Sequence, residues 1–168
     1  MDEAFTLLPQ EVTFALICIT SPGVQRLYPT WRTITNNHFH LLLETPHEAN
    51  LSKFMQYLNG NFARAYNKRH GKSGHFWGGR FHSTVIESDT QFFNTLFYIE
   101  LNMLRCRAVE NPEDWEWSSY RAHASGAEDP VVDFHELYLA LGSTPEERQK
   151  VYRDMAGAYM LEKGLQRQ

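Results

Sequence analysis

The hydrophobic pattern of this chain changes its period at Pro46. Before this proline, residues 12–20 and 32–44 contain runs of apolar and β-branched side chains, which are typical of strands. After it, apolar side chains recur every three or four residues, with Asn50 in the N-cap position, which predicts an amphipathic helix over residues 51–71. A chain with both periods packs strands against helices, so the sequence predicts an α+β domain.

Later segments continue this mixture of strand and helix patterns. Residues 76–87 are rich in aromatic and β-branched side chains and are predicted to form a strand. Residues 91–104 follow N-cap candidates at 88–90, and their apolar positions cover most of a helical circumference, so this helix should be largely buried. A last helix is expected over residues 144–160, because a capping box and a proline at the first helical position mark its start.

Length and composition favour one domain in a reducing compartment. A chain of 168 residues suits a single core. Its longest uninterrupted apolar run, residues 14–19, is far shorter than the roughly 20 residues of a membrane span, and its Met-Asp-Glu start lacks the basic character of a signal peptide. Cys18 and Cys106 have no metal-ligand spacing. We therefore expect a cytoplasmic protein with no membrane partner.

Positive charge is concentrated in the middle of the chain. The formal net charge is −4, but residues 51–109 contain eight basic and three acidic side chains, and the segments on either side are acidic. Local clustering, more than total charge, sets the field that a polyanion meets. Two interpretations stay open: a nucleic-acid-binding face, or the solvated surface of helices.

Two histidines alternate with apolar residues in the predicted strand over residues 32–44. Alternation along a strand places His38 and His40 on one face and sends Phe39 and Leu41 to the core. Neutral imidazoles that stand side by side can share a divalent metal ion. The alternative is that the two histidines form a polar strand face without a metal.

The helix predicted over residues 91–104 has one polar stripe. Asn94, Tyr98, Asn102 and Arg105 are spaced four, four and three residues apart, so they share a face of an otherwise apolar helix. A metal site built on two imidazoles needs a further donor, and this stripe is a candidate source. Read alone, the stripe favours the alternative of a buried tyrosine whose hydroxyl is satisfied by a neighbouring amide.

Four short motifs follow one another between residues 36 and 120. They are Asn37-His38-Phe39-His40-Leu41-Leu42 with Glu44-Thr45-Pro46, Gly74-His75-Phe76-Trp77 with Gly79-Arg80-Phe81, Tyr98-Ile99-Glu100-Leu101-Asn102, and Trp115-Glu116-Trp117-Ser118-Ser119-Tyr120. In this order they resemble the single-tyrosine HUH transposases, specifically the REP-associated branch. The resemblance implies an antiparallel sheet backed by helices, the ferredoxin-like HUH fold, over residues 1–125, followed by a helical tail over residues 126–168.

The resemblance also implies a site and a reaction. His38 and His40 correspond to metal ligands, Tyr98 to the nucleophile, and Asn102 to the position that completes the metal site. The expected reaction is cleavage and transfer of single-stranded or hairpin DNA through a 5′-phosphotyrosine, with Mg²⁺ or Mn²⁺ as the cofactor. Two imidazoles favour manganese or another transition metal, because magnesium prefers oxygen ligands. Relatives of this kind act as monomers or as homodimers.

Basic and aromatic side chains near the middle of the chain are the candidates for holding DNA. Single-stranded DNA is bound by cations that follow the phosphates and by aromatic rings on which bases stack. The candidates are Arg64, Lys68, Arg69, Lys72, Trp77 and Arg80. Cations at the end of a helix are also favoured by the helix dipole alone, which is the structural alternative for the first three.

The sequence departs from the family in two places. Residues 1–34 do not resemble it: no first helix is apparent, and Asn36 stands where relatives have proline in Met-Pro-Asn-His. Met103 replaces the proline that follows the helix asparagine. A divergent or truncated N-terminal part predicts an incomplete sheet and a looser metal site. Two other hypotheses therefore stay open: a decayed or domesticated nucleic-acid-binding relative, and a small interaction or metal-binding domain.

Overall fold

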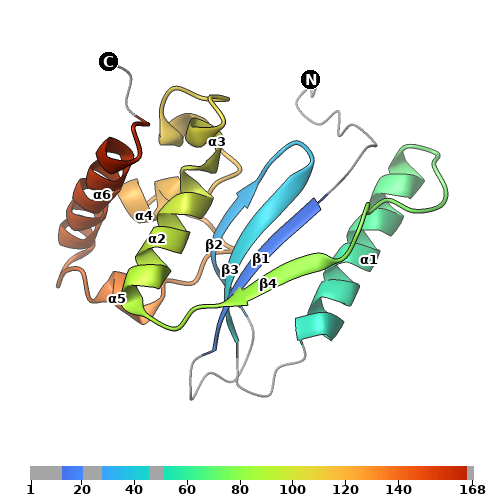
Figure 1. Ribbon diagram of the computed structural model, residues 1–168, viewed down its shortest axis with the longest axis horizontal. Helices are drawn as coiled ribbons and strands as arrows, with labels where there is room; N and C mark the ends of the chain where they lie inside the picture. Colours follow the sequence, from blue (N-terminus) through green and yellow to red (C-terminus); the bar gives the residue numbers. More distant parts are fainter. Residues whose placement is uncertain (1–12, 21–27, 46–50, 166–168) are drawn as a thin grey trace.

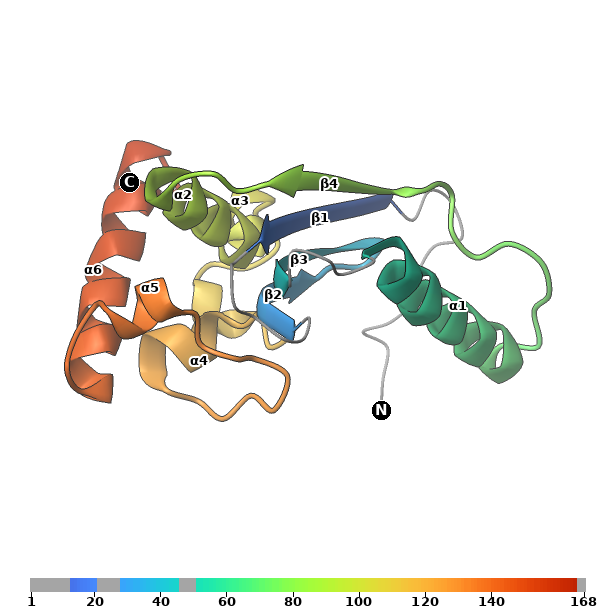
Figure 2. The ribbon, with the colours of Figure 1, turned by 90° about the horizontal axis from the view of Figure 1, so that it is seen from below.

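The computed structural model describes residues 13–20, 28–45 and 51–165 (Figure 1). It contains one four-stranded sheet in the order β2-β3-β1-β4. The strands are β1 (Thr13–Thr20), β2 (Tyr28–Ile34), β3 (His38–Thr45) and β4 (Phe81–Val85). The sheet lies between α1 on one side and the remaining helices on the other (Figure 2). The predicted α+β fold, with helices packed against a sheet, is thus confirmed.

The sheet is not antiparallel throughout, which corrects one detail of the expected fold. β2 and β3 pair antiparallel, as expected, but β1 pairs parallel with both β3 and β4. The link over residues 21–27 joins β1 and β2, which both lie beside β3. This link is shorter than the dozen or more residues of a crossover connection, so β1 and β2 run in opposite directions and β1 runs parallel to β3.

The strand predicted over residues 32–44 is in fact two strands joined by a turn. The backbone N–H and the side-chain hydroxyl of Thr35 both donate to the carbonyl oxygen of His38, each at 2.8 Å. Asn36 and Asn37 occupy the bend. Asparagine tolerates the backbone conformations of tight turns, so this pair was the turn signal that the strand interpretation overlooked.

Helix α1 (Leu51–Arg69) covers one face of the sheet, as the three- and four-residue spacing predicts. Its buried Met55 packs with Leu41 and Leu43 of β3 in a small apolar cluster. β4 follows α1 and is shorter than the predicted strand over residues 76–87. Phe76 and Trp77 lie before it and pack against Phe62 of α1 instead.

The other face of the sheet packs on the long apolar helix. This helix is α2 (Asp89–Glu100), capped by Ser88, and it is followed after Leu101 by the separate turn α3 (Asn102–Arg105). The predicted single helix over residues 91–104 is therefore interrupted at Leu101. Trp31 of β2 packs edge-to-face on Phe92 of α2, with ring centroids 4.9 Å apart.

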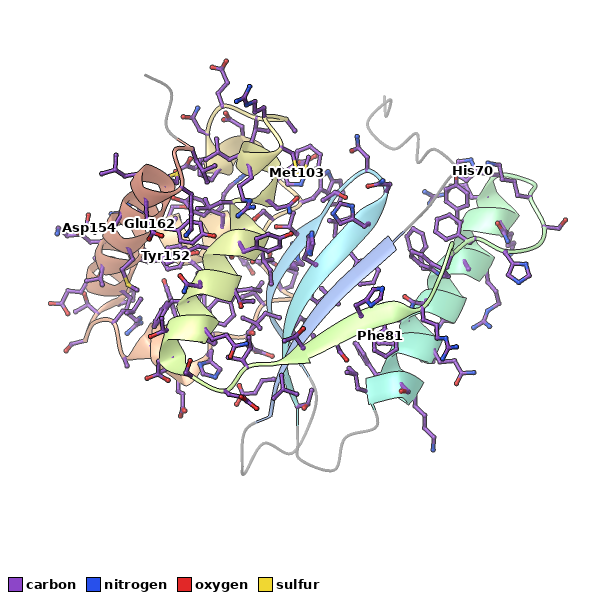
Figure 3. All side chains as sticks on the ribbon, viewed as in Figure 1. His70, Phe81, Met103, Tyr152, Asp154 and Glu162 are labelled. Carbon is purple, nitrogen blue, oxygen red and sulfur yellow. The ribbon has the colours of Figure 1, made fainter. Side chains whose placement is uncertain are left out.

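The C-terminal helices pack on one another, on α2 and on β2. They are η1 (Pro112–Asp114), α4 (Tyr120–Ser125), α5 (Glu136–Leu139) and α6 (Pro145–Glu162), the last starting with the predicted capping box. Tyr152 of α6 lies between α6 and α2, where it shares one core with Phe97 (Figure 3). No helix in the described part of the chain has the length and apolar character needed to cross a membrane.

Candidate active site

β3 places its two histidines next to each other on the face that α2 covers. The Nε2 atoms of His38 and His40 lie 3.0 Å apart, and the ring planes are nearly perpendicular. Leu42, two residues further, belongs to the core shared with α2, whereas Leu41 and Leu43 face α1. The alternation predicted from the sequence is therefore the alternation in the fold.

The turn before β3 fixes the orientation of His38. Its Nδ1 lies 2.7 Å from Asn37 Oδ1 and 3.0 Å from Thr35 Oγ1. The Thr35 hydroxyl already donates its hydrogen to the His38 carbonyl, so its oxygen can only accept from the ring. The network therefore assigns the ring proton to Nδ1 and leaves a lone pair on Nε2, which points at His40.

His40 is buried and neutral. Only 4% of its surface is exposed, and burial together with the neighbouring His38 lowers the pKa of its imidazole to about 4. Burial also lowers the pKa of His38. At neutral pH both rings are therefore uncharged, which is the form of imidazole that binds metal ions.

α2 and α3 bring the polar stripe to this histidine pair. The ring of Tyr98 meets that of His40 edge-on with centroids 5.6 Å apart, and its side chain is 37% exposed. The amide nitrogen of Asn102 lies 3.3 Å from His40 Nε2, and the guanidinium of Arg105 stacks over the Tyr98 ring. The interruption at Leu101 does not separate these residues, so the phenol, the amide and both imidazoles share one site.

The hydrogen-bond pattern of this site fits a bound cation. His40 Nε2 cannot both donate a proton to His38 and accept one from Asn102. If its proton sits on Nδ1 instead, two lone pairs face each other at 3.0 Å, and that buried Nδ1 has no hydrogen-bond partner among the described residues. A cation between the two Nε2 atoms removes the conflict, and the Asn102 amide, turned by 180°, would offer it an oxygen.

The described residues hold no larger cluster of metal ligands. Across residues 13–20, 28–45 and 51–165, no group of three or more His, Cys, Asp or Glu side chains is placed to hold a metal ion. Protein ligands for a metal at this site would thus be the two imidazoles and the Asn102 amide, with the other coordination positions open to water or substrate.

The basic residues predicted to contact DNA are exposed, but they are not gathered at the histidine pair. Arg64, Lys68 and Arg69 lie on α1, on the opposite side of the sheet from α2 (Figure 2). Lys72 and Arg80 are exposed on the segment between α1 and β4. The structure therefore separates a basic helix on one face from the tyrosine and the imidazoles on the other.

Trp77 has a packing role in this segment. It is half-buried, and its indole N–H donates to the carbonyl oxygen of Asn59 at 2.9 Å. Its ring packs against Phe39, Phe62 and Phe76. Only part of the Trp77 ring is therefore free to stack with a DNA base.

Sequence reasoning missed three residues that shape the site. Thr35 and Asn37 orient His38, and the turn-forming Asn pair beside the histidine was their signal. Glu100 is fully buried and accepts hydrogen bonds from Ser119, Tyr152 and the Nδ1 of His123. Its signal was a single acidic residue inside the apolar helix, because such a carboxylate must find partners when it is buried.

Residues 31–102 match the model of the family described as Transposase IS200 like. This segment is less than half of the chain and contains His38, His40, Tyr98 and Asn102. The match supports the transposase family suggested by the four motifs and does not distinguish the REP-associated branch. Comparison with curated proteins and with solved structures gives no match.

Proposed function

We propose that this chain is a transposase-type enzyme that cleaves and transfers single-stranded or hairpin DNA, with Tyr98 as the nucleophile. The observation that carries the proposal is the position of His40, whose ring is in contact with Tyr98 and 3.3 Å from the Asn102 amide. The phenol and the donor groups can therefore reach the same phosphate. The family match supports DNA as the substrate, and the REP-associated branch remains part of the proposal.

Tyr98 suits a reversible transfer of a DNA strand. Its Oη attacks the phosphorus, the Oη–P bond forms, and the P–O3′ bond breaks to give a 5′-phosphotyrosine and a free 3′ hydroxyl. The proton lost by the phenol is balanced by the proton gained by the 3′ oxygen. A phenolate is a better leaving group than an alkoxide, so a 3′ hydroxyl can later attack the enzyme-bound phosphate and rejoin a strand.

His38, His40 and Asn102 are the residues that would hold a divalent ion, Mg²⁺ or Mn²⁺. Such an ion supplies Lewis-acid polarisation of the scissile phosphate and stabilises its developing charge. Asn37 and Thr35 keep the Nε2 lone pair of His38 turned toward the site. Burial keeps His40 unprotonated, so the pair binds a cation without first losing protons.

The exposed cations on α1 and after it belong to this proposal as contacts for flanking DNA. Because α1 lies across the sheet from Tyr98, we place Arg64, Lys68, Arg69 and Lys72 on DNA that passes the cleavage point. Arg80, directly before β4, would contact DNA at that edge of the sheet. A helix that is basic at its last turn presents those charges to phosphates at its end.

A decayed relative that binds DNA without cutting it is the second candidate. One observation favours it: β1, the strand beside the histidine-bearing β3, pairs parallel with its neighbours, where the resemblance implies an antiparallel sheet. A rebuilt strand next to the metal-binding positions can displace them by fractions of an ångström, and such shifts cost activity before they cost binding.

A covalent-adduct assay separates the two candidates. The full chain is incubated with end-labelled single-stranded and hairpin oligonucleotides and Mn²⁺ or Mg²⁺, and adducts are resolved by denaturing electrophoresis. We expect an adduct that Tyr98→Phe abolishes and that Tyr57→Phe, on an exposed tyrosine of α1, leaves intact. DNA binding without an adduct across varied hairpins would overturn cleavage and select the second candidate.

A further inference from the structure

Arg105 lies beside Tyr98, and the mechanism above gives it no role. It is the last residue of α3, and its guanidinium carbon is 4.6 Å from the centroid of the Tyr98 ring. Its Nη1 donates a long hydrogen bond of 3.4 Å to the hydroxyl of Tyr159 on α6. Stacking on one side and this bond on the other hold the guanidinium against the phenol.

Most of the hydrogen-bonding capacity of Arg105 is unused. A guanidinium carries five N–H donors, and the bond to Tyr159 takes one of them. Among the described residues, none of the ion pairs involves Arg105, and its side chain is exposed to solvent. A positive charge with spare donors beside an accessible phenol is arranged to receive an anion.

An open groove gives that anion access to Tyr98. The groove has a volume of about 540 Å³, with Tyr98, Asn94 and Thr95 of α2 on one wall and Tyr159 of α6 on the other. Within the described part of the chain, no acidic side chain lines it, and Lys163 adds a positive charge. Arg105 contacts two of the residues that line the groove, Tyr98 and Tyr159. A nucleic-acid backbone can therefore lie along the polar face of α2, close to the guanidinium, without meeting a like charge on the described residues.

We infer that Arg105 binds the non-bridging oxygens of the phosphate that Tyr98 attacks. The inference rests on the proposed cleavage function and adds a residue that touches the reacting group. Arg105 neither takes nor gives a proton: it neutralises the charge on the phosphate oxygens while the Tyr98 Oη–P bond forms and the P–O3′ bond breaks. Its planar fork can bind two such oxygens at once, which an ammonium group cannot do in the same geometry.

The test compares variants on two linkages. Rates of adduct formation are measured for the full wild-type chain, Arg105→Ala and Arg105→Lys, on an oligonucleotide with a normal scissile phosphate and on one with a neutral methylphosphonate there. We expect Arg105→Ala to be about 100-fold slower than wild type on the phosphate, with Arg105→Lys between them. On the methylphosphonate, the ratio of the wild-type rate to the Arg105→Ala rate should be at least tenfold smaller, because the charge that Arg105 neutralises is absent.

Each outcome has a separate meaning. Arg121→Ala, on an exposed arginine of α4, should match wild type on both linkages. If Arg105→Ala slows both linkages equally, the residue only supports the fold or the Tyr98 ring, and the inference is wrong; thermal unfolding of the variant then measures that support. If wild type forms no adduct on the phosphate linkage, the proposed function itself fails, whatever Arg105 does.

Discussion

Protonation of His40 couples the candidate site to the free energy of unfolding. Burial and His38 lower its pKa from 6.5 to about 4, so the folded chain binds fewer protons than the unfolded chain between these values. Stability therefore falls as the pH drops from 6.5 toward 4, by about 3 kcal/mol if this histidine acts alone. Urea unfolding in EDTA at pH 4, 5, 6 and 7 measures the loss. His40→Gln should flatten this part of the profile, and an unchanged profile would contradict the assignment.

Replacing Tyr152 tests the role of Glu100, a buried carboxylate two residues from Tyr98. The side chain of Glu100 is fully buried, and one of its three donors is the hydroxyl of Tyr152, whose pKa burial and this carboxylate raise. Tyr152→Phe removes a donor to a buried acceptor and should cost about 1–3 kcal/mol in the free energy of unfolding. Tyr57→Phe, on an exposed side chain, is the matched control and should change it by less than about 0.5 kcal/mol. Equal losses in denaturant unfolding would argue against the network.

At the scale of elements, the sequence predicted long periodic segments well and their interruptions poorly. α1 and α6 follow from spacing and capping signals over four turns or more. The turn at Thr35 and the break at Leu101 were not predicted, because β-branched and apolar residues continue on both sides of each interruption and outweighed the Asn36-Asn37 turn signal. The turn is a local effect, closed by the hydrogen bonds that Thr35 donates to His38, and the break leaves Asn102 beside His40.

The β2–β3 turn gives an element-scale prediction about metal binding. Asn37 Oδ1 accepts from His38 Nδ1 at 2.7 Å, and this contact selects the tautomer with a free Nε2. Asn37→Ala should weaken Mn²⁺ binding about tenfold, because a hydrogen bond to the far nitrogen of a metal-binding imidazole fixes the orientation of the ring. Asn67→Ala, at an exposed amide contact on α1, should leave the affinity unchanged. Titration calorimetry with Mn²⁺ measures both, and equal affinities for Asn37→Ala and wild type would show that Thr35 orients His38 unaided.

On the scale of the whole molecule, the candidate site residues could be predicted because they lie on regular elements, β3 on one side and the consecutive helices α2 and α3 on the other. His38, His40, Tyr98 and Asn102 each lie at a strand or helix periodicity that the sequence displays. The direction of β1 could not be predicted, because strand direction depends on the length of the link to β2 and on which strand lies between them. The hydrogen bond from Arg105 to Tyr159 of α6 could not be predicted either, because it joins residues far apart in the chain.

The separation of charge across the molecule predicts how DNA binding responds to salt. The net charge is −4, so attraction to DNA must come from local clusters such as Lys68 and Arg69 at the end of α1. If both contact phosphates, replacing both with alanine should lower the slope of log K against log salt by about 1.4, since each single-strand contact contributes about 0.7. Fluorescence anisotropy between 50 and 200 mM NaCl measures the slope.

Lys150→Ala, on a lysine of α6 paired with Asp154, should leave this slope unchanged. An unchanged slope in the double variant would place the DNA on the α2 face alone, because the α1 charges would then meet only solvent.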